Sequence, residues 1–258
     1  LTIADMEWWK FYADSTLCSI ISRTLANNKN ILAAAARVEQ SRMLYGIDKA
    51  NMLPTLDGRA YGNQETNDYY GEKHVTDPEY GLKASLSWEA DLWGKLRWAK
   101  RKGMANYVAS IEDERAMRIT LIAEAAGSYI RLMALENELT IVQRTLATRL
   151  EGVKQAKLRF EGGLTSETVY QQAKVEYAAT AALIPNLERQ IQTTKSSIAL
   201  LMGEYADTDI QVANFDIEAM VPDSLSIGIP SQLLQRRPDV RASEANLKAA
   251  MADVGIAY

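Results

Sequence analysis

A helical pattern that continues for more than sixty residues after Gly94 is the feature that most constrains this chain. Leucine and valine recur along it at steps of three and four residues, which is the spacing of a coiled-coil seam. The seam comprises Leu132, Leu135, Leu139, Val142, Leu146, Leu150 and Val153. A helix from Gly94 to Phe160 would be roughly 100 Å long, because each residue adds about 1.5 Å. The sequence therefore predicts a helical rod that cannot belong to a compact domain.

A tight reversal follows this helix. Residues 161–166 read Glu-Gly-Gly-Leu-Thr-Ser, and paired glycines commonly end a helix. Thr165 or Ser166 can cap the next helix, which we expect to run from Glu167 to Met202. Pro185 should kink this return helix, because proline removes one hydrogen bond and clashes with the preceding turn. Residues 93–203 are thus predicted to form a long antiparallel helical hairpin.

The composition excludes several classes of protein. The 258 residues include 29 basic and 33 acidic side chains, and this balance gives no basic excess for binding nucleic acid. A single Cys and a single His exclude a disulfide framework, a zinc site of the CxxC type and most His-based catalysis. The acidic run at Glu112, Asp113 and Glu114 is interpreted as a solvated helix face. We therefore predict neither an enzyme nor a bound metal or cofactor.

Between the N-terminal region and the long helix, the pattern changes to strict alternation. Apolar residues occupy every second position over residues 80–92, and a shorter alternating run covers residues 55–64. The apolar positions of the longer run are Tyr80, Leu82, Ala84, Leu86, Trp88, Ala90 and Leu92. With the polar loop 65–79 between them, the two runs predict a β-hairpin. A tilted strand of a membrane barrel has this pattern, and so does an amphipathic hairpin packed on helices in a soluble protein.

The remaining segments predict helices towards both ends of the chain. The Asn-rich residues 27–30 interrupt an N-terminal helical region, and a last helix begins near Pro238. With an offset of 209 residues, residues 25–49 align with residues 234–258 without a gap. We therefore expect one structural repeat followed by the start of a second. The expected segments are N-terminal helices over 1–53, the β-hairpin over 54–92, the helical hairpin over 93–203, a connection over 204–234, and the first helix of the second repeat over 235–258.

Four stretches of the sequence resemble a known family. Residues 86–97 (Leu-Ser-Trp-Glu-Ala-Asp-Leu-Trp-Gly-Lys-Leu-Arg) are similar to its segment between the second strand and the long helix, and residues 159–166 (Arg-Phe-Glu-Gly-Gly-Leu-Thr-Ser) to the tip of its helical hairpin. Residues 229–241 resemble the start of its second repeat, and Trp8-Trp9 with residues 25–28 resemble its N-terminal part. This is the outer membrane factor (TolC-like) family, and the resemblance is to its multidrug-efflux outer-membrane lipoprotein branch in particular.

The resemblance implies a mainly α-helical homotrimer located in the outer membrane, with two repeats in each protomer. A twelve-stranded barrel would cross the membrane, and a periplasmic helical tunnel would reach a periplasmic adaptor fed by an inner-membrane pump. Carried over by motif, the adaptor-docking tip would be Gly163, Leu164, Thr165 and Ser166. The lipid-facing residues of the second strand would be Tyr80, Leu82, Ala84, Leu86, Ala90 and Leu92.

Aromatic and basic residues gather where the second predicted strand meets the long helix. They are Trp88, Trp93, Trp98, Lys95 and Arg97. Such a group suits a solvated helix start, and it also suits the boundary between membrane and water. The resemblance favours the membrane boundary.

The sequence departs from the family pattern in three respects. The residues of the second repeat that would help to close the periplasmic aperture cannot be assigned in it. A second strand pair with a second helical hairpin is missing, and so is the N-terminal Cys that carries lipid in this branch. Cys18 does not replace it, because Cys18 lies in an amphipathic helix and is expected to be a buried thiol. We therefore expect an incomplete passive conduit for small molecules in an efflux or export system. The alternative is a soluble coiled-coil scaffold or an adaptor-like periplasmic tether.

Overall fold

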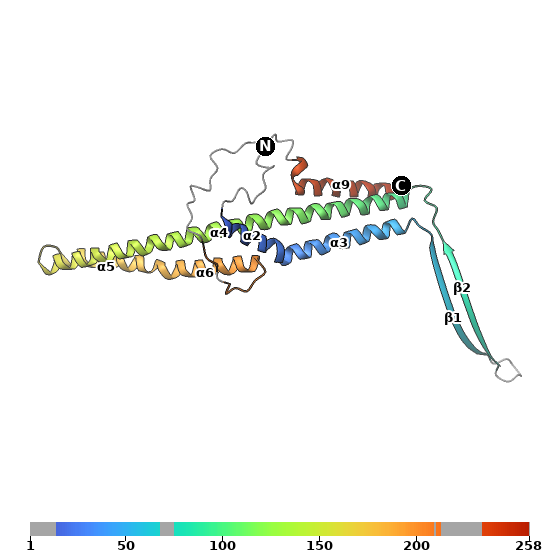
Figure 1. Cartoon of the computed structure of the whole chain (residues 1–258), viewed down its shortest axis with the longest axis horizontal. Helices are drawn as coiled ribbons and strands as arrows, with labels where there is room; N and C mark the ends of the chain where they lie inside the picture. The colour runs from blue at the N-terminus through green and yellow to red at the C-terminus, as the bar shows by residue number, and fades with distance from the viewer. Residues whose placement is uncertain (1–13, 68–74, 209, 213–233, 258) are drawn as a thin grey trace. The chain divides into compact units, whose positions relative to one another are not determined.

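The computed structural model describes residues 14–67, 75–208, 210–212 and 234–257 (Figure 1). The elements in these ranges are α2 (Ser15–Asn27), α3 (Lys29–Ala50), β1 (Thr55–Asn67), β2 (Val75–Ser87), α4 (Lys95–Glu161), α5 (Glu167–Ala181), α6 (Leu183–Leu201) and α9 (Pro238–Ala257). The chain is mainly α-helical with one two-stranded antiparallel sheet, as predicted. The Trp8-Trp9 motif, the tip of the predicted β-hairpin loop and most of the predicted connection over 204–234 lie outside the described residues.

The described residues fall into two units. The first comprises α2, the beginning of α3, the part of α4 from Glu114 onward, α5 and α6. The second comprises the remainder of α3 and of α4, both strands and α9. Each unit has its own packing and is described separately.

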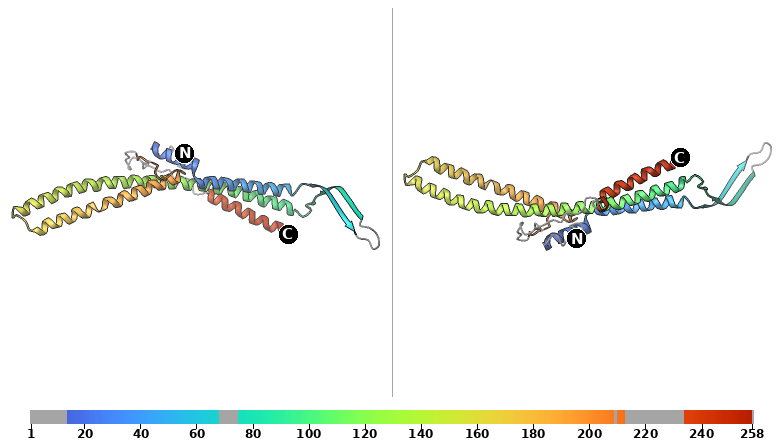
Figure 2. Two further views of the ribbon diagram at one scale, coloured as in Figure 1. Left: turned by 90° about the horizontal axis from the view of Figure 1, so that it is seen from below. Right: turned by 90° about the horizontal axis from the view of Figure 1, so that it is seen from above.

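The first unit contains the predicted helical hairpin. The later part of α4 runs antiparallel to α5 and α6, and the two arms lie side by side in both views of Figure 2. The whole of α4 has 67 residues, which corresponds to about 100 Å. The return arm is interrupted at Ala182, between α5 and α6. The predicted kink is therefore confirmed, and its cause is that Pro185 has no N–H to donate to the carbonyl of Ala181.

The core of this unit lies where α2 packs against the middle of α4 and the end of α6. Its buried members are Leu17, Ile20, Ile21, Ala125, Ala126, Tyr129, Leu132, Met133, Ile198, Met202 and Ile210. The predicted seam of α4 is buried at Leu132 and Leu135, half-buried at Val153, and 39% exposed at Leu150. Burial decreases towards the tip because two helices alone cannot enclose the seam between them. Cys18 is half-buried, so the prediction of a buried thiol is wrong. The reason is that α2 places Cys18 at the edge of this core.

Asn28 joins three helix ends in the first unit. Its side-chain oxygen accepts a hydrogen bond from the N–H of Asn30 at 2.8 Å, which caps α3. Its side-chain amide donates to the carbonyl of Leu201, at the end of α6, at 2.9 Å. The predicted break at residues 27–30 is therefore confirmed. The offset of the repeat is also found in the helices, since α3 begins at Lys29 and α9 begins 209 residues later at Pro238.

In the second unit, α9 packs along the first part of α4. The buried stripe of α9 consists of Ala242, Ala245, Ala249 and Ala252. Such small side chains allow the two helices to approach closely. The side chain of Glu112 in α4 is only 3% exposed and forms an ion pair of 2.9 Å with Arg241 of α9. The prediction of a solvated helix face is therefore wrong at Glu112, because α9 covers this position.

The strands differ in their bounds from the predicted runs. The predicted runs were residues 55–64 and 80–92, whereas β1 extends to Asn67 and β2 covers Val75–Ser87. The pairing continues into the predicted loop as far as Asn67 opposite Val75. Ala90 and Leu92 therefore do not belong to the strand, contrary to prediction. The alternation continues past Ser87 in the sequence, but residues 88–94 lie outside the strand and lead into the start of α4.

Candidate membrane-facing hairpin and docking tip

The strand register collects the apolar residues of both strands on one face of the β-hairpin. Directly paired residues of antiparallel strands share a face. The pairs on the apolar face are Leu56 with Leu86, Gly58 with Ala84, Ala60 with Leu82, and Gly62 with Tyr80. The pairs on the polar face are Asp57 with Ser85, Arg59 with Lys83, Tyr61 with Gly81, and Asn63 with Glu79. The hairpin is thus two-sided along this length.

Neither face of the hairpin is covered by the described residues. Apart from half-buried Gly81, the strand residues whose burial is described are all exposed. On the apolar face, Tyr80 is 83% exposed, Leu82 is 89% exposed and Leu56 is 75% exposed. A contiguous apolar surface of this kind marks a contact with a membrane or with another protein. The predicted alternative of a hairpin packed on helices of the same chain finds no such contact among these residues.

Two tyrosines shield two glycines across the strands. The ring of Tyr61 lies over Gly81 on the polar face. The ring of Tyr80 lies over Gly62 on the apolar face, where a Cβ added to the glycine would be 3.2 Å from it. The hydroxyl of Tyr61 also donates to Glu79 at 3.4 Å. Aromatic rings over cross-strand glycines pin the register, so these pairs help to determine which residues share each face.

Side-chain hydrogen bonds hold the base of the hairpin. Asp91 accepts hydrogen bonds from the backbone N–H groups of Leu96 and Arg97, each at 3.0 Å, and from Nε of Arg97 at 3.1 Å. Burial raises the pKa of Asp91, but these hydrogen bonds and the charge of Arg97 outweigh it and hold the pKa below its ordinary value. The indole N–H of Trp88 donates to the carbonyl of Met52 at 3.2 Å. This bond connects the segment after β2 with the segment before β1.

The predicted interface residues do not all share one environment. Trp88, Trp93, Lys95 and Arg97 are exposed, and Trp93 reaches 81%. Trp98 lies instead between α4 and α9, with Gly255 directly over its ring and the guanidinium of Arg101 at 4.5 Å.

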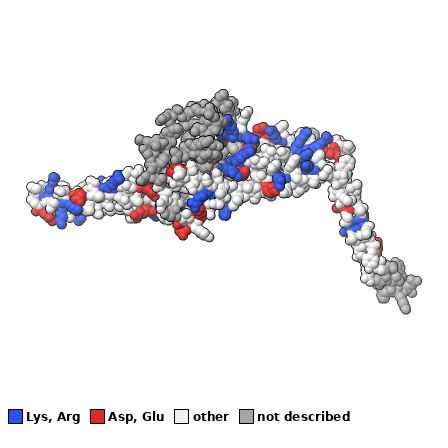
Figure 3. All heavy atoms as spheres, viewed as in Figure 1, with Lys and Arg blue, Asp and Glu red and all other residues white. Residues whose placement is uncertain are grey.

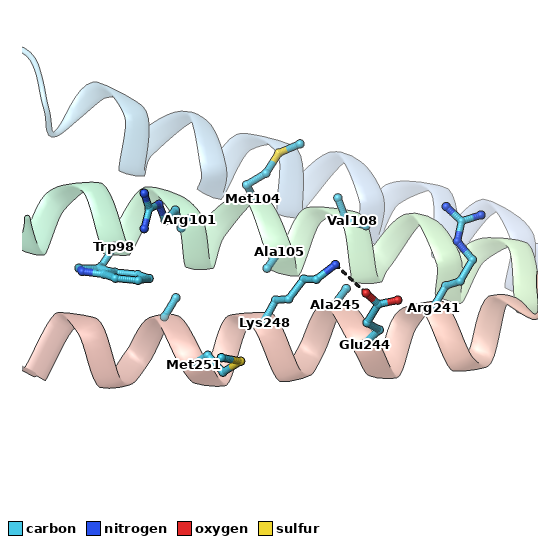
Figure 4. A pocket seen from close by; sticks show the side chains of 11 residues that line it. Trp98, Arg101, Met104, Ala105, Val108, Arg241, Glu244, Ala245, Lys248 and Met251 are labelled. Carbon is cyan, nitrogen blue, oxygen red and sulfur yellow. Dashed lines mark ion pairs between the residues drawn. The ribbon is translucent and has the colours of Figure 1, made fainter. Parts of the chain in front are cut away.

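Figure 4 shows Trp98 at one end of a groove between α4 and α9. The groove has a volume of about 510 Å³. Met104 and Val108 line it from α4, and Lys248 and Met251 line it from α9. Packing between the two helices therefore accounts for the position of Trp98.

The tip of the helical hairpin is a closed turn with an exposed apex. Gly163 has a φ of 71°, and the N–H of Leu164 donates to the carbonyl of Arg159 at 2.8 Å. This pattern is a Schellman motif, which the predicted glycine pair explains. Ser166 occupies the cap position of α5, although its side chain makes no capping hydrogen bond. Leu164 is 78% exposed at the apex, so the turn presents one leucine outward.

The hairpin arms are also connected by side chains next to this turn. The rings of Phe160 and Tyr170 stack with their centroids 6.2 Å apart. Further from the turn, Arg149 of α4 forms an ion pair with Glu176 of α5. The structure therefore brings the four predicted tip residues together on one braced turn.

Comparison with known proteins decides the family. The family model described as outer membrane efflux protein matches residues 20–204. The chain belongs to the outer membrane efflux protein family. This family member is an outer-membrane protein. None of the described helices is both long enough and apolar enough to cross a bilayer.

The outer membrane efflux protein is similar to curated relatives and to solved structures. It is 30% identical to the pyoverdine export outer membrane protein OpmQ of Pseudomonas putida, over 99% of this chain and 56% of that protein. It is 27% identical to the cation efflux system protein CusC of Escherichia coli, over 97% of this chain and 54% of that protein. The chain therefore spans about half the length of the curated relatives it matches.

Among solved structures, the outer-membrane channel OprN matches with a TM-score of 0.87 and 30% identity, over 97% of this chain and 57% of that one. A structure of CusC matches with a TM-score of 0.88 and 25% identity, over 98% and 58%. The fold of this outer membrane efflux protein is therefore that of part of such a channel.

Proposed function

We propose that this chain forms part of an outer-membrane channel-tunnel, a passive conduit and not an enzyme, in a tripartite efflux or export system. Small molecules would pass through a water-filled lumen, and an inner-membrane pump would supply the energy through a periplasmic adaptor. The observation that carries the proposal is the two-sided β-hairpin, whose apolar face suits lipid and whose polar face suits a wet lumen. Membership in the outer membrane efflux protein family supports the same function.

The base of the hairpin supplies residues suited to the membrane boundary. We assign Tyr80, Leu82, Ala84 and Leu86 of β2 to the lipid-facing surface. Exposed Trp88 and Trp93, with Lys95 and Arg97 beside them, would lie at the periplasmic edge of the bilayer. Tryptophans are enriched at membrane–water interfaces, where an apolar ring meets a polar environment. Trp98 is not assigned to this boundary, because it packs against α9.

The repeat supports assembly into a larger ring, which we propose to be a homotrimer. In α9, the buried alanine stripe rests on α4 of the other repeat. The same positions of α3, displaced by 209 residues, are Ala33, Ala36, Gln40 and Met43, and all four are exposed. Met43 is 54% exposed. An equivalent helix from another repeat would cover this stripe of α3 as α4 covers that of α9.

Adaptor docking at the tip is the second contact we propose. The braced turn presents Leu164 outward, and a leucine flanked by small residues can insert between helices of a partner. Leu164→Asp should abolish export and leave trimer assembly intact. Leu164→Met is the matched control and should retain export, because it preserves an apolar side chain of similar volume. Normal export by Leu164→Asp would contradict docking at this residue.

The test of the proposed function is the behaviour of the full-length protein in the membrane. A conduit requires detergent for extraction from the outer membrane and is trimeric in that detergent. The alternative, a coiled-coil scaffold or tether, would be released without detergent. Recovery of the full-length protein in the detergent-free fraction would contradict the conduit.

A further inference from the structure

Two basic residues lie side by side on the polar face of the β-hairpin. The register pairs Arg59 of β1 directly with Lys83 of β2, and both side chains are exposed. They are the only basic residues in the sequences of the two strands. Basic atoms are visible part-way along the hairpin in Figure 3.

This pairing is unfavourable for the hairpin itself. Like charges directly opposite each other on antiparallel strands are destabilising. Within the described part of the chain, neither Arg59 nor Lys83 forms an ion pair that would offset the repulsion. Packing among the residues that the structure describes therefore gives no reason for two cations in one pair.

Acidic residues on the same face belong to other pairs along the hairpin. Asp57 belongs to the next pair towards the base, and Glu79 lies two pairs away in the opposite direction, where it accepts the hydrogen bond from Tyr61. One pair beyond Glu79, the register pairs Glu65 with Asp77. Successive pairs on one face are about 7 Å apart, because each strand residue advances about 3.4 Å. Arg59 and Lys83 thus form a local positive band, with Asp57 on its base side and Glu79, Glu65 and Asp77 on the side of the loop.

We propose that Arg59 and Lys83 form a cationic ring in the lumen that makes the conduit favour anionic compounds. The inference rests on the proposed function, because this face lines a lumen only when the opposite face meets lipid. Each protomer of the assembly would contribute the same pair at the same height. Rings of Arg and Lys select anions in pores, because they lower the electrostatic energy of an anion passing through.

The experiment measures ion selectivity of the full-length protein in planar lipid bilayers under a KCl gradient. The native channel should show a reversal potential displaced towards the chloride equilibrium potential. The double variant Arg59→Gln/Lys83→Gln should shift it towards the potassium equilibrium potential. The displacement of the native channel's reversal potential should also diminish in 1 M salt, because the screening length falls from about 10 Å at 0.1 M salt to about 3 Å at 1 M salt.

Asp57→Asn is the matched control on the same face. Removing this acid should shift the reversal potential further towards chloride, and a merely structural disturbance would not give opposite signs for the two variants. An unchanged reversal potential in a conducting double variant would overturn the cationic ring and leave the conduit standing. Absence of any conductance in the native protein would overturn the proposed function, and the ring with it.

Discussion

The hydroxyl of Tyr129 donates a 2.7 Å hydrogen bond to Oδ2 of Asp14, and both side chains are buried. The other oxygen of Asp14 accepts from the N–H of Thr16 at 2.7 Å and from that of Leu17 at 3.3 Å. Asp14 thus caps α2 and, through Tyr129, fixes the start of α2 to the middle of α4. The core of the first unit forms around this connection.

Tyr129→Phe should destabilise the first unit by about 1.5–3 kcal/mol, which is the range for a hydrogen bond to a charged group. The change removes one donor and leaves the ring in place, so the loss reports on the hydrogen bond. The measurement is urea unfolding of the full-length protein, followed by helical circular dichroism. Tyr205→Phe is the control, since Tyr205 is 87% exposed and should tolerate the change. Equal midpoints for the two variants would contradict a stabilising role for the bond.

Gly203→Ala should also destabilise this unit, by more than about 1 kcal/mol. Gly203 has a φ of 72°, and an added Cβ would lie 2.8 Å from the carbonyl oxygen of Asn27. Gly152→Ala should have the opposite sign, because an added Cβ meets nothing within 4 Å and alanine favours the helix. Thermal unfolding of both variants provides the comparison. Stabilisation by Gly203→Ala would contradict the close approach of Gly203 to the carbonyl of Asn27.

Arg241→Met should destabilise the contact between α4 and α9 by about 1.5–3 kcal/mol, because it removes an ion-pair partner of buried Glu112. The double variant Glu112→Leu/Arg241→Met should recover most of the loss, since it replaces both charges with apolar groups. A double-mutant cycle on denaturant unfolding measures the coupling between the two residues. Additive effects of the single changes would indicate that the ion pair contributes nothing to this contact.

The start of α4 should weaken at low pH because of Asp91. The pKa of this carboxyl is lower in the folded protein than its ordinary value of 3.8, so its stabilising effect is complete above that value. The effect is lost as the pH falls below 3.8 and through the pKa of the folded state. Hydrogen exchange at the amides of Leu96 and Arg97, corrected for the intrinsic rate at each pH, should show loss of protection at pH 3.

Asp91→Asn supplies the control for this pH dependence. The asparagine cannot ionise, so the protection of the same two amides should vary little between pH 6 and pH 3. A similar pH dependence in the variant would assign the effect to another group.

Periodicity predicted most of the fold because the helices obey local rules. The seam of α4, the break at residues 27–30, the interruption caused by Pro185 and the start of α9 at Pro238 each depend on residues close in sequence. The end of β2 was not predictable in this way. Alternation continues to Leu92 in the sequence. Asp91, however, accepts hydrogen bonds from the N–H groups of Leu96 and Arg97, so the segment after Ser87 belongs to the start of α4 and not to the strand.

Contacts between segments that are distant in the chain could not be predicted from the sequence. Glu112 is buried where α9 packs on α4, and its ion-pair partner Arg241 lies more than a hundred residues further along the chain. The pairing of Arg59 with Lys83 depends on the register, which a single strand pattern does not specify. The Gly62–Tyr80 and Gly81–Tyr61 contacts help to fix that register, but β1 also contains Gly58, so the glycines alone do not identify the pairing.

Cysteine labelling of the full-length protein in outer-membrane vesicles tests most directly whether the two faces of the hairpin meet lipid and water. Leu82→Cys and Lys83→Cys are neighbours on opposite faces of β2, and both are made in a Cys18→Ser background. The variant at position 82 carries its thiol on the apolar face and should react with a lipid-soluble maleimide but resist a charged, water-soluble thiol reagent. The variant at position 83 should react with the charged reagent. Equal reaction of both variants with the charged reagent would contradict a membrane-facing hairpin.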